Sequence, residues 1–135
     1  MTIEAGHTVE TVLVEYLKRT TIVQYAGASG DYNPLHSDEL FTTKVAGYPS
    51  VFAHGMLTMG LAVQTIVPWL GDVGRILDCG VRFTRPVVVD PEAGADVGIV
   101  AKVGAVDDDS ARIDLTVTHA GATVLVKAQV RVRLA

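Results

Sequence analysis

Hydrophobic and polar residues alternate along several segments of the chain. Residues 7–17 are rich in β-branched side chains with a loose alternation and predict a first strand. Residues 75–89, 95–106, 111–119 and 123–134 are rich in Val, Ile and Thr and are separated by turn-forming Asp, Pro and Gly residues. We expect three or four consecutive antiparallel strands here. Ile113, Leu115, Val117, Ala128, Val130, Val132 and Leu134 fall on alternate positions, which predicts one covered and one solvated face.

Residues 55–70 differ, because they are apolar on nearly every helical face until Pro68 and Gly71 end the segment. This pattern predicts one long helix that is buried all round. A shorter helix is expected through residues 22–26, capped by Thr20 or Thr21, and another from residue 38 to about 44, capped by Ser37. We therefore predict an α+β fold, a single domain over residues 1–135 with an antiparallel sheet wrapped around a central helix.

Composition narrows the class of protein. The 135 residues carry a net charge of −4, which argues against a nucleic-acid binder. The segment 55–70 is short for a membrane span, and residues 1–20 lack the basic start and apolar run of a secretory signal. The lone Cys79 fits a reducing compartment and a place in the core. We expect a cytoplasmic protein.

The chemistry is concentrated in the segment Ser29-Gly30-Asp31-Tyr32-Asn33-Pro34-Leu35-His36. On a continuous helix Asp31 and His36 would lie roughly 140° apart and could not act together. Gly30 permits unusual backbone angles, and Pro34 pushes the residue before it out of the helical region. The chain should therefore bend and aim both side chains at one place.

A carboxylate and an imidazole in a partly apolar site can orient a water molecule, remove its proton and return a proton elsewhere. Such a pair suits addition of water next to a carbonyl, provided that the developing oxyanion is stabilised. Gly55 is a candidate for that role, because it begins the long apolar helix, where free backbone N–H groups favour negative charge.

This segment, with Tyr25 before it and Ala53-His54-Gly55-Met56 after it, resembles the hydratase 2 motif of MaoC-like (R)-specific enoyl-CoA hydratases and dehydratases, which have the hot-dog fold. A longer agreement through residues 53–60, 69–74 and 81–84 resembles the catalytic B subunit of (3R)-hydroxyacyl-carrier-protein dehydratases in this family. The resemblance implies that Asp31 and His36 are the catalytic pair and that the Gly55 N–H binds the thioester oxygen. Asn33 is carried over as a residue that shapes the bend, beside the substrate. Thr42 stands where an alanine is expected and should alter the wall of the acyl site.

Simpler roles compete with some of these assignments. His54 is expected to hold the loop before the helix, and Met56 and Met59 fit either the core or a wall along the acyl chain. No metal is expected, because the spacing of Asp31, His36, Asp38 and His54 matches no common ligand pattern. The basic residues that could bind phosphates or an acidic carrier protein are Lys44, Arg75, Arg82, Arg85, Arg131 and Arg133.

The predicted activity is reversible hydration of trans-2-enoyl thioesters to (3R)-3-hydroxyacyl thioesters, without a cofactor beyond the CoA or acyl carrier protein that carries the substrate. Two alternatives remain at this point: a non-catalytic hot-dog subunit that binds acyl thioesters in a heterodimer, and a hot-dog thioesterase. The resemblance also implies a homodimer or a heterodimer with a related subunit. Acyl chain length, the carrier and the physiological direction of the reaction are left open by the sequence.

Overall fold

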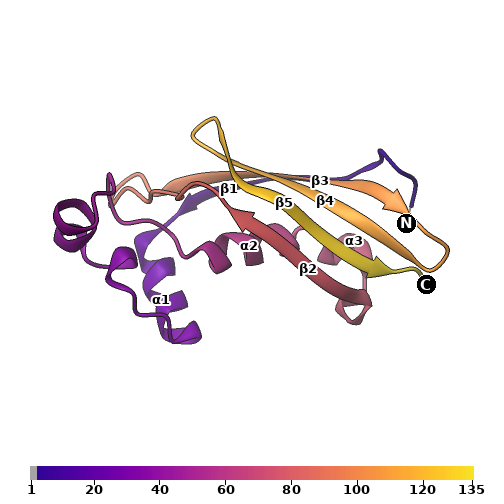
Figure 1. Cartoon of the computed structure of the whole chain (residues 1–135), viewed down its shortest axis with the longest axis horizontal. Coiled ribbons are helices and arrows are strands. Elements are labelled where there is room, and N and C mark those ends of the chain that lie inside the picture. The colour runs from indigo at the N-terminus through magenta and orange to yellow at the C-terminus, as the bar shows by residue number, and fades with distance from the viewer. Residues whose placement is uncertain (1–2) are drawn as a thin grey trace.

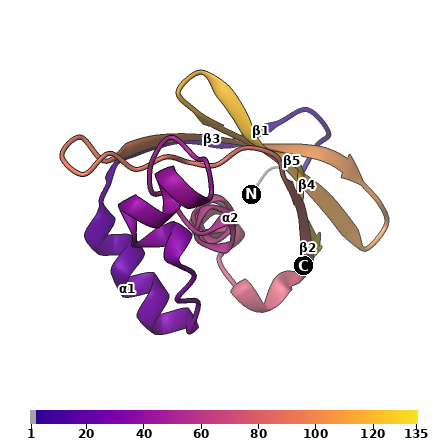
Figure 2. The ribbon, with the colours of Figure 1, turned by 60° about the vertical axis from the view of Figure 1, so that its left-hand side comes forward.

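The computed structural model describes residues 3–135, which form a curved antiparallel sheet with the helices on one side of it (Figure 1). The strands lie in the order β1 (Thr8–Leu17), β3 (Ala95–Val106), β4 (Ser110–His119), β5 (Ala122–Arg133) and β2 (Ile76–Phe83). Between β1 and β2 the chain forms α1 (Arg19–Ser29), a 3-10 helix (Pro34–His36), a π-helix (Phe41–Val45), α2 (Gly55–Gln64), α3 (Val67–Leu70) and a second 3-10 helix (Val73–Arg75). Figure 2 shows α2 inside the curve of the sheet. The predicted α+β class and wrapped sheet are confirmed.

The strand alternation read from the sequence places the core correctly. Ile113, Val117, Val130 and Val132 are fully buried on the concave face, whereas Arg131 points into solvent. Ala62 of α2 is also fully buried and belongs to the same hydrophobic cluster. The sheet and the central helix therefore share one core.

The sequence predicted three or four consecutive antiparallel strands, and three are consecutive in the sheet. β3, β4 and β5 form consecutive hairpins, but β2 pairs with β5 and β1 pairs with β3, so β2 does not neighbour the strand that follows it. β2 also ends at Phe83 rather than near residue 89. Pro86 lies in the part that leaves the sheet, where a residue without an N–H cannot donate to a ladder.

The long helix is shorter than predicted and is not buried all round. α2 ends at Gln64, four residues before Pro68. Pro68 has no N–H to donate to the Gln64 carbonyl, and the proline ring clashes with that carbonyl in a continuing helix. The buried positions follow one helical face at intervals of four, and these are Thr58, Ala62, Ile66 and Leu70. The opposite face is open, and Met56 is 56% exposed. A single sheet covers only one side of this helix.

Three smaller predictions also fail. Cys79 is exposed rather than in the core, because it lies on β2 at the edge of the sheet. α1 begins after Lys18, with neither Thr20 nor Thr21 as its cap. Asp38, not Ser37, accepts a hydrogen bond from the Phe41 amide at 3.0 Å and so caps the next helical turn.

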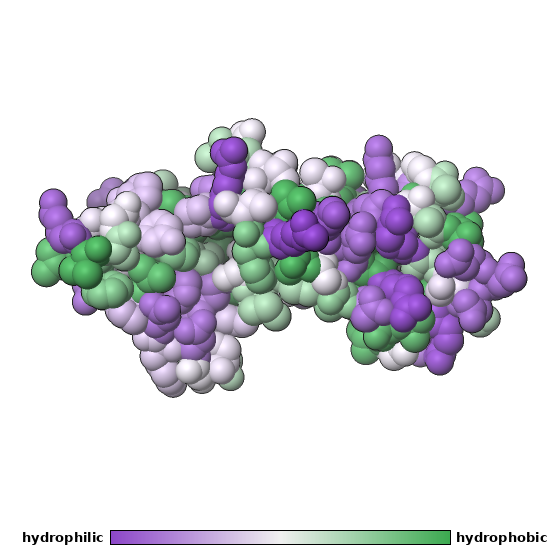
Figure 3. Space-filling model, viewed as in Figure 1, coloured by the Kyte–Doolittle hydropathy of each residue, from purple (hydrophilic) through white to green (hydrophobic). Residues whose placement is uncertain are grey.

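Polar and apolar residues are interspersed on the face shown in Figure 3, with apolar side chains gathered at the end where the π-helix lies. Leu40 and Val45 in that region are 70% and 72% exposed. Among the described residues, none of the helices has both the length and the apolar character needed to cross a bilayer.

Candidate active site

The bend after α1 has the local structure that its sequence predicts. Gly30 takes a left-handed conformation at φ 74° and its amide donates to the Ala26 carbonyl, which ends the helix. Asn33 then accepts a hydrogen bond from the Leu35 amide at 3.0 Å, and Pro34 opens the 3-10 helix that ends at His36. Asp31 and His36 thus lie on the two sides of a tight turn.

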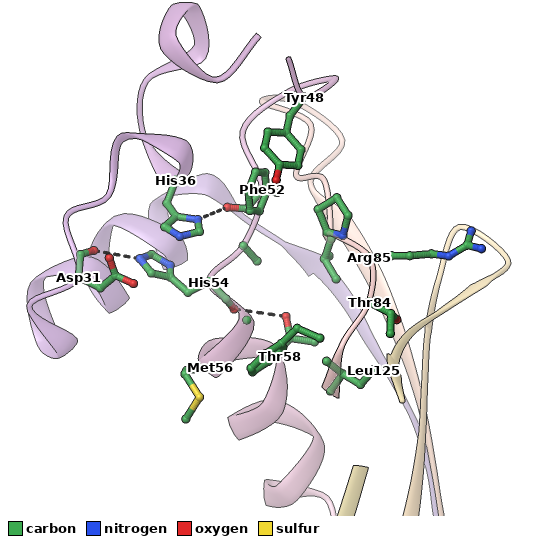
Figure 4. A pocket seen from close by; sticks show the side chains of 15 residues that line it. Asp31, His36, Tyr48, Phe52, His54, Met56, Thr58, Thr84, Arg85 and Leu125 are labelled. Carbon is green, nitrogen blue, oxygen red and sulfur yellow. Dashed lines mark hydrogen bonds between the residues drawn. The ribbon is translucent and has the colours of Figure 1, made fainter. Parts of the chain in front are cut away.

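This turn brings the two side chains together, and His54 joins them. A carboxylate oxygen of Asp31 and one ring nitrogen each from His36 and His54 all lie within 4.8 Å of one another. Figure 4 shows the three side chains meeting above the start of α2. The convergence of Asp31 and His36 was predicted from the bend, whereas the inclusion of His54 was not.

The hydrogen bond of His36 selects its tautomer. Nδ1–H donates to the Phe52 carbonyl at 2.7 Å, so Nε2 carries the lone pair. Partial burial lowers the pKa of His36 below its usual 6.5, partly offset by the bond to the Phe52 carbonyl, while His54 lowers it further and Asp31 raises it. A neutral imidazole with a free Nε2 is the form that can accept a proton from water.

His54 is the most buried member of the cluster, with 2% of its surface exposed. It is the N-cap residue of α2, and its Nε2–H donates to the Asp31 carbonyl at 3.1 Å. Its ring stacks on His36 with the centroids 3.9 Å apart and the planes at 24°, and Tyr25 of α1 meets it edge-on at 4.8 Å. The sequence predicted that His54 holds the loop before the helix; it also holds the Asp31 backbone.

The cluster has the N and O atoms that zinc prefers, although spacing alone gave no sign of it. Imidazole lone pairs lie in the ring plane. With the two rings stacked at 24°, the lone pairs of His36 and His54 do not converge on one point about 2.1 Å from both nitrogens. This arrangement favours proton transfer over metal binding.

Gly55 is the first residue of α2, where helix geometry leaves backbone amides without an intrahelical acceptor. Within residues 3–135, neither the Gly55 amide nor the Met56 amide makes a hydrogen bond. A Cβ built on Gly55 would lie 2.7 Å from the ring of Phe83. Glycine therefore lets Phe83 pack directly against the start of the helix.

A cavity of about 420 Å³ joins these features. Asp31, His36 and Gly55 all line it, and so does Met56. Its remaining lining residues come from the loop before α2, from α2 itself, from the end of β2 with the segment after it, and from β5, and they are Tyr48, Phe52, Ala53, His54, Thr58, Phe83, Thr84, Arg85, Pro86, Val87 and Leu125. The Asp31 carboxylate, the His36 ring, the amide end of α2 and a mostly apolar wall thus open on one space.

Other predicted site residues lie elsewhere. Met59 is not among the residues lining the cavity, and Asn33 lines a second hollow of about 140 Å³ that shares Asp31 and His36 with the first. Thr42 is fully buried, and its hydroxyl donates to the Pro34 carbonyl at 3.2 Å instead of forming the acyl wall. Of the six basic candidates only Arg85 lines the cavity. Thr84, Pro86 and Val87 were missed because the predicted strand extended to residue 89, although Pro86 cannot donate to a ladder and was a signal that the strand ends earlier.

The family model of the MaoC like domain matches residues 2–123. The chain belongs to this family. A solved MaoC-like dehydratase superposes with a TM-score of 0.92 at 34% identity, covering 98% of this chain and 41% of that one. The hot-dog fold expected from the resemblance is confirmed.

Two MaoC-like relatives match over part of the chain. The 3-hydroxyacyl-thioester dehydratase Y of Mycobacterium tuberculosis is 46% identical over 61 residues, which are 44% of this chain and 21% of the relative. The peroxisomal enoyl-CoA hydratase 2 of Arabidopsis thaliana is 54% identical over 61 residues, covering 44% of this chain and 19% of the relative. The matched part thus spans about a fifth of each relative's length.

A solved complex of Mycobacterium tuberculosis HadBC, a 3R-hydroxyacyl-ACP dehydratase, has a TM-score of 0.72 at 19% identity and covers 99% of this chain and 98% of that one. At this identity the likeness is one of fold.

Proposed function

We propose that this chain catalyses the reversible hydration of trans-2-enoyl thioesters to (3R)-3-hydroxyacyl thioesters. The observation that carries the proposal is the meeting of Asp31 and the free Nε2 of His36 in a cavity whose wall includes the start of α2. Membership of the MaoC-like family and relatives named as hydratases and dehydratases support it.

In the hydration direction Asp31 and His36 orient one water molecule, and Nε2 of His36 takes a proton from it. The water oxygen bonds to C3 of the enoyl group while the C2=C3 electrons move toward the thioester carbonyl. The Gly55 amide donates to the oxyanion that forms. The imidazolium then returns its proton to C2, and the carbonyl reforms, so that one water molecule has been added. Dehydration follows the same steps in reverse.

The roles of the other predicted residues follow from their places. We assign Met56 to the wall beside the thioester and Asn33 to the support of the bend, and the lining gives no reason to keep Met59 as a contact in the single chain. No cofactor or metal takes part in the proposed steps. The carrier is CoA or an acyl carrier protein, and Arg85, which lines the cavity, is the candidate cation for its phosphate or acidic groups.

We further propose that the chain works as a dimer, with a second copy or a related hot-dog subunit. The edge strand β2, where residues 77–80 are all exposed, and the open side of α2 support this proposal, because both leave surface that a partner can cover. A cytoplasmic location also remains a proposal.

The test uses Asp31→Asn and His36→Ala, with His119→Gln as a matched control. His119 also hydrogen-bonds a backbone carbonyl, that of Asp96 at 2.8 Å, but lies outside the cavity. Hydration of crotonyl-CoA, followed by loss of enoyl absorbance, should fall about 100- to 10,000-fold in both site variants and stay unchanged in the control. Near-normal turnover in folded site variants would refute the mechanism. Release of free thiol from a saturated acyl-CoA would identify a thioesterase instead.

A further inference from the structure

His54 makes more contacts with the catalytic pair than its predicted role in the loop requires. It is buried between α1 and the bend, and it touches both members of the pair in different ways. Toward Asp31 it offers a hydrogen bond to the backbone carbonyl, at 3.1 Å from Nε2. Toward His36 it offers a ring face, with the centroids 3.9 Å apart.

The hydrogen bond from His54 restrains Asp31 from outside the bend. Asp31 is exposed and follows Gly30, whose left-handed backbone has nothing within 4 Å of the place where a Cβ would be. Within the bend, the Asp31 amide donates a hydrogen bond to the Ser29 hydroxyl, and the Asp31 carboxylate accepts one from the Asn33 amide, both at 3.2 Å. The bond from His54 ties this stretch to the start of α2, where Gly55 lies.

The stacked ring restrains His36 from the other side. His36 is held at Nδ1 by the Phe52 carbonyl and at its edge by the Phe52 ring, with centroids 5.2 Å apart. The face of the ring lies on His54. Rotation of the His36 ring about its side-chain bonds would therefore break either the hydrogen bond to the Phe52 carbonyl or the stacking on His54.

We propose that His54 is the positioning residue of this site, which holds the Asp31 backbone and the His36 ring in one geometry relative to the start of α2. This inference rests on the proposed hydratase function. His54 does not accept or donate the transferred proton, because its Nε2–H is used by the Asp31 carbonyl and its Nδ1 is buried with no partner among the described residues.

Two substitutions separate the two contacts. His54→Gln keeps an N–H donor at about the reach of Nε2 but loses the ring, and His54→Phe keeps a ring against His36 but loses the donor. Reacting groups displaced by about 1 Å can lose about 100-fold in rate. We expect His54→Phe to lower kcat for crotonyl-CoA about 10- to 100-fold with KM within about 3-fold, because the Asp31 carbonyl is released. His54→Gln should also lower kcat, but by less, because the Asp31 carbonyl keeps its donor and only the His36 ring is released.

The pH profile gives a second readout that a purely structural residue would not move. The titratable groups around His36 and His54 are each other, Asp31 and Tyr25. The electrostatic effect of His54 lowers the pKa of His36, and both substitutions remove that effect. The acidic limb of the kcat/KM profile should therefore move to higher pH in both variants, and an NMR titration of the His36 ring should show the same direction without substrate.

The outcomes decide between the possibilities. Wild-type kcat in both folded variants would overturn the proposal, and so would an acidic limb that neither variant moves. If His54→Phe does not fold, the proposal stands only when His54→Gln lowers kcat and shows the upward shift. His119→Gln should change neither readout. Failure of the wild-type chain to hydrate any enoyl thioester would refute the proposed function itself and is distinguishable from all of these results.

Discussion

Replacement of Gly55 by alanine tests the proposed oxyanion site through a steric conflict that the structure defines. The added Cβ would stand 2.7 and 2.8 Å from two ring carbons of Phe83, closer than real Cβ contacts come. To reach 3.4 Å, where ordinary contacts begin, the ring or the helix start has to retreat by about 0.7 Å. Phe83 is 51% exposed, so part of this shift can be taken up by the ring, and the rest moves the amide end of α2.

Overpacking of this kind costs about 1–3 kcal/mol in the free energy of unfolding, which lowers Tm by roughly 4 °C per kcal/mol in a domain of this size. Removal of an oxyanion donor costs about 100- to 1,000-fold in kcat, and a displaced donor should cost less, on the order of 10- to 100-fold. Gly55→Ala should therefore lower both Tm and kcat, with the N–H still present.

A double-mutant cycle with Phe83→Ala identifies the cause. In Phe83→Ala/Gly55→Ala the ring atoms that meet the new Cβ are gone, so the second substitution should cost much less stability and activity than it does alone. Thermal unfolding by circular dichroism gives the stability terms, and crotonyl-CoA hydration gives the activity terms. Additive effects, or a Gly55→Ala variant that behaves as wild type, would refute the idea that glycine is needed for the close packing of Phe83.

Three further predictions follow from particular contacts. Because burial lowers the pKa of His36 below 6.5, kcat/KM should stay high as the pH falls to 6.5 and should decline only at lower pH. The free energy of unfolding should also decrease below pH 6.5, because there the unfolded chain binds a proton on His36 more readily than the folded chain does. An acidic limb of the kcat/KM profile above pH 6.5 would contradict this prediction. Thr42→Ala should lower the free energy of unfolding by only about 0.5–1.5 kcal/mol relative to Thr42→Ser, since the Pro34 carbonyl still accepts hydrogen bonds from the Ser37 and Asp38 amides. A changed preference for acyl chain length in Thr42→Ala would show that Thr42 does shape the acyl site. Glu39→Gln should lower the free energy of unfolding by about 0.5–1 kcal/mol at pH 7, because the carboxylate pairs with Arg19 at 2.9 Å and accepts a hydrogen bond from Ser50 at 2.7 Å. The Ser50 hydrogen bond is the main cause that lowers the pKa of Glu39, so the stability difference between wild type and variant in urea unfolding curves should vanish as the pH falls through that lowered pKa. A stability difference that persists in acid would point to packing instead.

The bend and the strand faces were predictable because each depends on neighbours in the chain. Gly30 can adopt φ 74° with no help from distant residues, and Pro34 restricts Asn33 through a local clash, so the turn between Asp31 and His36 is encoded in the motif itself. The alternation of Val130 and Val132 with Arg131 likewise reports a local property, since successive side chains on a strand face opposite ways.

What only the tertiary structure decided is which distant segments meet. Cys79 looked like a core residue until β2 paired with β5 at the edge of the sheet, and a predicted long strand ended where residues 84–87 turned toward the cavity. His54 carries no local sign that its ring stacks on His36 or that its Nε2 holds Asp31, because those contacts depend on where α2 lies against the bend. The sequence by itself determined the turn that brings Asp31 and His36 together. The fold decided how His54 contacts Asp31 and His36, because the position of α2 against the sheet is set by long-range packing that spacing along the chain does not encode.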